Sequence, residues 1–135
     1  MKYVLDTNTV IAALNGTPAV RARLATLAAS DLGVPVVVFA ELFHGARRSA
    51  RSVENLERIR SLAGAAVVLP VDQAIAETYG VVRASVELRG LRKSDFDLVI
   101  ACTALHYDAV LVTHDGALKD GSIEGLVVED WLDAG

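Results

Sequence analysis

Residues 3–14 read YVLDTNTVIAAL, an apolar run that stops at Asp6, passes through polar residues and becomes apolar again. The short run Tyr3–Leu5 is typical of a buried strand. The side-chain oxygens of residues 7–9 are of the kind that begin helices, and the apolar spacing that follows predicts a short helix ending near Leu14. A strand that passes directly into a helix indicates an α/β fold.

Apolar runs and helical spacings keep alternating along the rest of the chain. The further predicted strands are 34–38, 66–69, 109–112 and 126–128. Helices are predicted from 18, 40, 52, 72 and 95 onward. Strands that are almost continuous in Val, Ile and Leu are covered on both faces, which favours a parallel sheet. The sequence therefore predicts one domain over residues 1–135, a three-layer α/β sandwich with a mostly parallel sheet of about five strands.

Composition excludes several classes of protein. The chain has 135 residues, of which 53% are hydrophobic, so it can bury a core without disulfides or a structural zinc. Its one cysteine, Cys102, excludes a disulfide framework. The absence of a signal peptide and of about 20 consecutive apolar residues favours a cytoplasmic protein with no membrane contact. The net charge of −4 argues, taken as a whole, against binding nucleic acid.

Four acidic residues lie where predicted strands end or where a helix begins. Asp6 follows the first strand, Glu41 comes shortly after the second, Asp115 follows the fourth, and Asp97 opens the helix before it. The carboxyl ends of parallel strands share one edge of a sheet, and ligands bind there. Each acid alone could instead be a helix cap or the partner of an arginine. Together they predict a cluster of carboxylates.

Such a cluster has a chemical consequence. Neighbouring carboxylates repel one another, and a divalent cation relieves that repulsion. A donor set made only of oxygens favours Mg²⁺ or Mn²⁺ over zinc. These ions activate a bound water for hydrolysis of a phosphodiester, a reaction that needs no nucleotide cofactor and no nucleophilic side chain.

Four segments, in order, resemble the PIN-domain family, and in particular VapC-type toxins of prokaryotic toxin–antitoxin pairs. They are VLDTN (4–8), AELFHGA (40–46), SDFDLVIA (94–101) and LVTHD (111–115), and the closing VEDWL (128–132) is also similar. The resemblance implies a Mg²⁺- or Mn²⁺-dependent endoribonuclease that acts on RNA, is inhibited by a cognate antitoxin and forms homodimers. It implies that Asp6, Glu41, Asp97 and Asp115 are the catalytic, metal-binding acids. The last of these positions often carries Asn in such toxins, so the number of ions stays open.

Other polar residues have two readings each. Thr7 and Asn8 either orient Asp6 or a water, or cap a helix; Thr113 is expected to support the site, and Asp95 is either a cap or a supporting residue. Five basic residues either bind the RNA backbone or lie on solvated helix faces. They are Arg47, Arg48, Arg51, Arg92 and Lys93.

Three other functions fit part of the pattern. A haloacid-dehalogenase-like phosphatase would use Asp6 as its nucleophile, but it needs a second aspartate where this chain has Asn8. A receiver-like switching module needs an aspartate at the end of the third strand, and Asp72 offers only a helix cap there. A catalytically silent PIN scaffold would bind RNA or protein without cutting it.

Overall fold

The strands of the computed structural model form one sheet in the order β3-β2-β1-β4-β5. Each pair of neighbours is parallel. The structure describes residues 1–133, and the last two residues of the expected domain, 134–135, lie outside this range. The strands are β1 (Tyr3–Leu5), β2 (Leu32–Pro35), β3 (Val67–Leu69), β4 (Val110–Val112) and β5 (Val128–Glu129). Because all five run in the same direction, their carboxyl ends meet at one edge.

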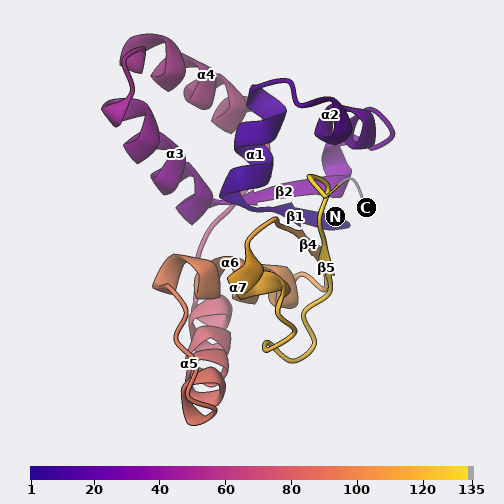
Figure 1. The fold of residues 1–135 in the computed structure, drawn as a ribbon, viewed down its shortest axis with the longest axis vertical. Coiled ribbons are helices and arrows are strands. Elements are labelled where there is room, and N and C mark those ends of the chain that lie inside the picture. Colours follow the sequence, from indigo (N-terminus) through magenta and orange to yellow (C-terminus); the bar gives the residue numbers. More distant parts are fainter. Residues whose placement is uncertain (134–135) are drawn as a thin grey trace.

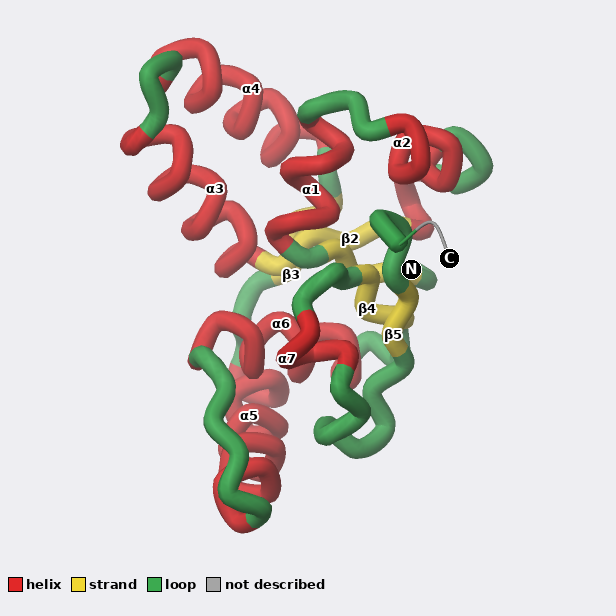
Figure 2. Tube along the Cα trace, viewed as in Figure 1, coloured by secondary structure: helices red, strands yellow, loops and turns green. Residues whose placement is uncertain are grey.

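Helices cover the two faces of this sheet. Figure 1 shows α1–α4 on one side and α5–α7 on the other, and Figure 2 shows the strands as a thin layer between them. This arrangement confirms the predicted α/β sandwich. The helices are α1 (Thr7–Leu14), α2 (Pro18–Leu24), α3 (Val36–Arg48), α4 (Ser52–Ala65), α5 (Gln73–Leu88), α6 (Asp95–His106) and α7 (Gly116–Lys119), with a short 3₁₀ helix at Ala29–Asp31.

The core lies on both sides of β1 and β4. Val4, Leu111 and Val112 are fully buried, and α6 packs against these strands with nearly all of its middle residues buried. Among these residues is Cys102, which is a free thiol. No helix described within residues 1–133 is both long and apolar enough to cross a membrane.

The second strand is shorter than the sequence predicts. Residues 34–38 were expected to form a strand, but β2 ends at Pro35 and α3 begins at Val36. Valine favours strands, yet this preference is weak and packing overrides it: Val38 is fully buried on the inner face of α3. The fifth strand also lies later than the expected 126–128. As a result Glu41 lies in the second turn of α3, rather than at the start of the helix that was expected from residue 40.

Gly33 in β2 lies where the backbone packs closely against its neighbours. A Cβ atom at this position would meet the side chain of Met1 and would come within 2.7 Å of Leu69 Cδ1. Leu69 is buried and has little room to move, so we expect Gly33→Ala to lower the free energy of unfolding by about 1–2 kcal/mol. The control is Gly80→Ala in α5, where a Cβ meets nothing within 4 Å. Urea unfolding should show a loss for the first variant and none for the second; equal stability of both would contradict this packing argument.

Candidate active site

Asp6 lies directly after β1, at the edge where the carboxyl ends of the strands meet. Its side chain is almost completely buried and caps α1, with Oδ1 accepting a hydrogen bond from the Thr9 backbone N–H at 3.0 Å. The other carboxylate oxygen accepts a hydrogen bond from the Thr113 hydroxyl. Burial raises the pKa of Asp6 and the charge of Asp115 adds to this, although the hydrogen bonds from Thr113 and Thr9 oppose it. The fold therefore holds this carboxyl in a place where its negative charge is costly.

Thr113 connects Asp6 with Asp115. It follows β4 and is fully buried, and its hydroxyl donates to Asp6 while accepting from the Asp115 backbone N–H at 3.0 Å. Asp115 caps α7, with Oδ1 accepting from the Ala117 backbone N–H at 2.9 Å. Two acids that are far apart in the sequence are thus joined through a single hydroxyl.

Asp97 is in the first turn of α6. Its backbone N–H donates to the Ser94 hydroxyl at 3.1 Å, so Ser94 is the residue that caps this helix. Burial, together with the neighbouring carboxyls of Asp115 and Glu41, raises the pKa of Asp97 to about 6, although the hydrogen bond with Ser94 opposes this. These three acids therefore share one electrostatic environment.

Glu41 approaches the same place from α3. Its Oε1 accepts a hydrogen bond from the Thr7 hydroxyl at 2.7 Å, and Thr7 is the residue that follows Asp6. Asn8, one residue further on, has an exposed position on α1. Of the two predicted supporting residues at the start of this helix, Thr7 is thus the one in contact with an acid.

The arrangement suits a hard divalent cation by its charge and its donor atoms. Four carboxyls gather there from separate parts of the chain: Asp6, Glu41, Asp97 and Asp115. Their mutual repulsion and partial burial make a positive charge favourable among them, and carboxylate oxygens are the ligands that Mg²⁺ and Mn²⁺ prefer. As they stand, no three His, Cys, Asp or Glu side chains within residues 1–133 are grouped to hold an ion.

Asp95 is not the cap of α6, and its carboxylate contacts residues of α5. Its carboxylate accepts hydrogen bonds from the Tyr79 hydroxyl at 2.5 Å and from Arg83 at 3.2 Å, both on α5. Ser94 is the cap because it directly precedes the first residue of the helix, where its hydroxyl accepts from the backbone N–H of Asp97. The expectation that Asp95 caps the helix is therefore wrong, and its role is to join α6 to α5.

The predicted RNA-binding residues have different surroundings. Arg47 and Arg48 are exposed at the end of α3, and Arg92 is exposed before α6. Arg51 is exposed and lies 3.8 Å from Glu54. The Lys93 side chain, in contrast, is only 3% exposed and pairs with Asp120 at 2.9 Å, so it fits neither the expected RNA contact nor the alternative of a solvated helix face.

An open cavity of about 450 Å³ begins at Glu41 and follows α3 outward. Thr7, Glu41, His44 and Arg48 are among its lining residues. His44 is three residues after Glu41 in α3, and residues three and four apart share a face of a helix, so the spacing alone indicates that the two side chains are neighbours. The cavity links Glu41 to an exposed arginine, Arg48.

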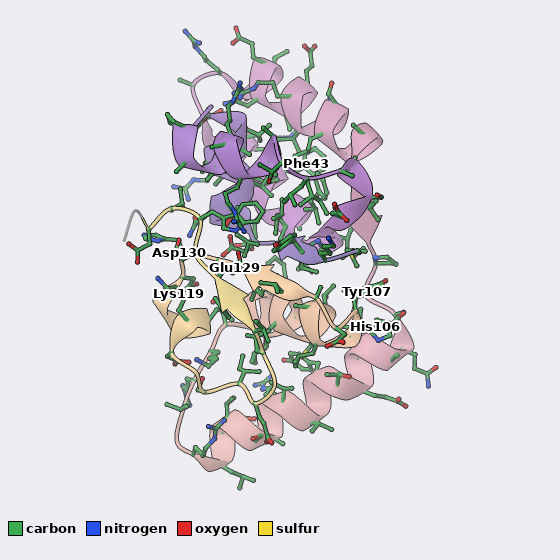
Figure 3. All side chains as sticks on the ribbon, turned by 90° about the vertical axis from the view of Figure 1, so that its right-hand side faces the viewer. Phe43, His106, Tyr107, Lys119, Glu129 and Asp130 are labelled. Atoms are coloured by element: carbon green, nitrogen blue, oxygen red, sulfur yellow. The ribbon has the colours of Figure 1, made fainter. Side chains whose placement is uncertain are left out.

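Asp130, in the C-terminal segment after β5, contacts the residue before Asp115 and the last residue of α7. Asp130 lies 2.5 Å from Lys119 Nζ and 2.8 Å from His114 Nδ1, and Figure 3 shows Lys119 and Asp130 side by side. His114 is thus directed to Asp130, although it is next to Asp115 in the sequence. These contacts hold α7 and the end of β4 in place.

Thr113→Val should show how much the buried hydroxyl contributes to the stability of the folded protein. The substitution keeps the shape but leaves the buried Asp6 carboxylate without one donor, so we expect a loss of about 1–3 kcal/mol in the free energy of unfolding. The control is Thr103→Val, because the Thr103 hydroxyl is equally buried but donates only to the Val99 carbonyl at 2.7 Å. Thermal melts in EDTA measure both; similar values for the two variants would contradict the role assigned to Thr113.

Comparison with known proteins identifies the family that has this architecture. The profile of the PIN domain matches residues 3–123. The chain belongs to the PIN-domain family. One of its relatives is ribonuclease VapC1 of Haemophilus influenzae (strain R2866). The two are 32% identical over 133 residues, which cover 97% of this chain and 98% of the relative. Another is the tRNA(fMet)-specific endonuclease VapC of Shigella flexneri, 32% identical with the same coverage of both chains.

Solved PIN-domain structures agree with the fold. DNA-bound VapBC from Salmonella typhimurium superposes with a TM-score of 0.87 at 29% identity, covering 97% of this chain and 98% of that one. VapBC-1 from nontypeable Haemophilus influenzae superposes with a TM-score of 0.85 at 31% identity, covering 98% and 100%. The match along the full length confirms the PIN fold and the resemblance to VapC-type proteins.

Proposed function

We propose that this PIN-domain protein is a Mg²⁺- or Mn²⁺-dependent endoribonuclease and the toxin of a toxin–antitoxin pair. The observation that carries the proposal is the meeting of Asp6, Glu41, Asp97 and Asp115 at one edge of the sheet. Burial, with the Asp115 and Glu41 carboxyls nearby, raises the pKa of Asp97 to about 6, so the charged form of this group is costly without a cation. Two relatives that span nearly the whole chain carry the names ribonuclease and endonuclease.

The acids share one role in this proposal, and two threonines hold them in position. Asp6, Glu41, Asp97 and Asp115 would hold the cation, which when bound lowers the pKa of a coordinated water and stabilises charge on the phosphodiester. Thr113 keeps the Asp6 carboxylate fixed, and Thr7 does the same for Glu41. Asp97, with its raised pKa, must lose its proton before it can bind a cation, so activity should rise through about pH 6.

The cavity along α3 is the proposed path for RNA. Arg48 lies at its outer end and would contact a backbone phosphate, while His44 lies between Arg48 and Glu41 and would contact the nucleotide beside the cut. Three more exposed arginines would add phosphate contacts. Arg47 lies at the end of α3, Arg51 directly before α4 and Arg92 before α6. This positive charge lies outside the acidic cluster, so a chain with a net charge of −4 can still bind RNA.

A second cavity, about 280 Å³ in volume, is proposed to receive the antitoxin. It lies between α1, α3 and α4 and also reaches Glu41. Its lining is largely apolar and includes Ile11, which is 41% exposed although it is a large hydrophobic residue. One similar solved structure, VapBC-5 from Mycobacterium tuberculosis, is a member of the VapBC family of toxin–antitoxin systems. A protein segment in this cavity would cover the approach to Glu41. We place the protein in the cytoplasm with its RNA and antitoxin, and expect a homodimer, which sedimentation velocity tests.

The test of the activity is cleavage of a defined RNA. Purified protein should cut the RNA internally with Mg²⁺ or Mn²⁺ and stop when EDTA is added. The phosphatase alternative predicts instead that a small phosphomonoester is hydrolysed and that Asp6 is labelled covalently. Cleavage of RNA that continues in EDTA would overturn the proposed function.

A further inference from the structure

Lys93 has unusual surroundings for a lysine in a loop. Its side chain is 3% exposed, and Nζ donates to Asp120 Oδ2 at 2.9 Å and to the Ala117 carbonyl. Asp120 is itself fixed by the Ser122 hydroxyl at 2.6 Å and the Ser122 backbone N–H at 2.9 Å. A buried ammonium is stable only when such partners satisfy it, and removing one of them is costly.

These partners connect Lys93 with two of the acids. Ala117, whose carbonyl accepts from Lys93, donates its N–H to Asp115. Ser94, the next residue after Lys93, accepts from the backbone N–H of Asp97. The Asp97 and Asp115 carboxyls in turn lie close enough to interact with each other. One closed set of contacts thus joins the loop before α6 to the short helix α7.

We propose that Lys93 is a positioning residue that sets the separation of the Asp97 and Asp115 carboxylates by tying α7 to the loop before α6. Helix α7 is a single short turn, and outside Lys93 it is held by the Asp115 cap, the buried side chain of Leu118 and the Lys119–Asp130 pair. Losing the lysine should therefore let Asp115 drift relative to Asp97. The inference deepens the proposed function, because the affinity for a divalent cation depends on where these two acids are held.

Lys93→Met tests this, because methionine keeps the apolar stem and removes the charge. We expect Mn²⁺ affinity, measured by electron paramagnetic resonance, to fall about tenfold, as is usual when a residue that supports metal ligands is lost. Hydrogen exchange should become faster in residues 115–120, whereas KM for RNA should stay unchanged. Lys2→Met is the control, because Lys2 is exposed and loses the same charge without touching either segment.

Each other outcome overturns the inference. Unchanged Mn²⁺ affinity and exchange would make Lys93 an ordinary structural lysine, and a raised KM with unchanged Mn²⁺ affinity would make it an RNA contact. If Lys93→Met does not fold, Asp120→Asn takes its place, because it removes the ion pair but keeps the hydrogen bond to the Ala117 carbonyl. We then expect a smaller fall in Mn²⁺ affinity and a smaller increase in hydrogen exchange of residues 115–120. If wild-type protein neither binds Mn²⁺ nor cuts RNA, the proposed function fails, while the exchange measurement still decides whether Lys93 holds α7.

Discussion

Asp97→Asn is expected to slow RNA cleavage by roughly a thousandfold, which corresponds to about 4 kcal/mol of lost transition-state stabilisation. The amide has nearly the shape of the carboxyl but lacks its charge, so it cannot hold a divalent cation as strongly. Asp97 shares its environment with Asp115 and Glu41, so its loss removes charge from the middle of the cluster. Single-turnover cleavage of a labelled RNA at saturating Mg²⁺ measures the effect.

Asp95→Asn is the matched control for this variant. It makes the same chemical change two residues earlier on the same helix, where the carboxylate contacts Tyr79 and Arg83 instead of the other acids. We expect cleavage at the wild-type rate. If both variants lose activity equally, or Asp97→Asn keeps it, Asp97 is not part of the catalytic machinery.

The same Asp97→Asn substitution should stabilise the metal-free protein at neutral pH. The pKa of Asp97 is about 6 in the folded protein against an ordinary value of 3.8, so the folded state holds this proton more tightly than the unfolded state. Stability is then lost as the pH rises from about 4 to 6, and stays lost above that. Asparagine carries no charge to lose. Allowing for solvent screening of a half-exposed group, we expect a gain of about 1 kcal/mol at pH 7.5.

Urea unfolding in EDTA at pH 4 and at pH 7.5 measures this gain. The two proteins should have nearly equal stability at the lower pH, and the variant should be more stable at the higher pH. Added Mg²⁺ should close the gap, because it stabilises only the protein that binds it. A variant that is less stable than wild type at pH 7.5 would show that burial and the neighbouring acids do not make the Asp97 charge unfavourable as inferred.

Much of the fold and of the site could be predicted from local patterns. The apolar run before Asp6 and the acid after it correctly indicated a strand that ends at the edge of a sheet. Repetition of this pattern predicted the α/β sandwich, whereas the PIN family was indicated by the resemblance of four motifs. Residues 36–38 were misjudged because three valines favour a strand locally, whereas burial of Val38 in α3 is a property of the whole fold. Local preference cannot report a contact made elsewhere.

The roles of Asp95 and Lys93 could not be read from the sequence for the same reason. Both are charged residues beside Asp97, and nothing nearby in the chain distinguishes them from site residues. Only the packing of α5 directs Asp95 toward Tyr79 and Arg83, and only the position of α7 buries Lys93. The charge of these two residues did not predict their roles, because their partners lie far away in the sequence.

Binding of Mn²⁺ to the purified protein tests the central claim most directly, namely that the acids at the carboxyl edge of the sheet form one cation site. Electron paramagnetic resonance of free Mn²⁺ during a titration reports the affinity without relying on any reaction. We predict saturable binding by wild-type protein and by Asp95→Asn, and a loss of affinity of about tenfold or more in Asp97→Asn. Equal affinity in wild type and Asp97→Asn, or no saturable binding by wild type, would contradict the account.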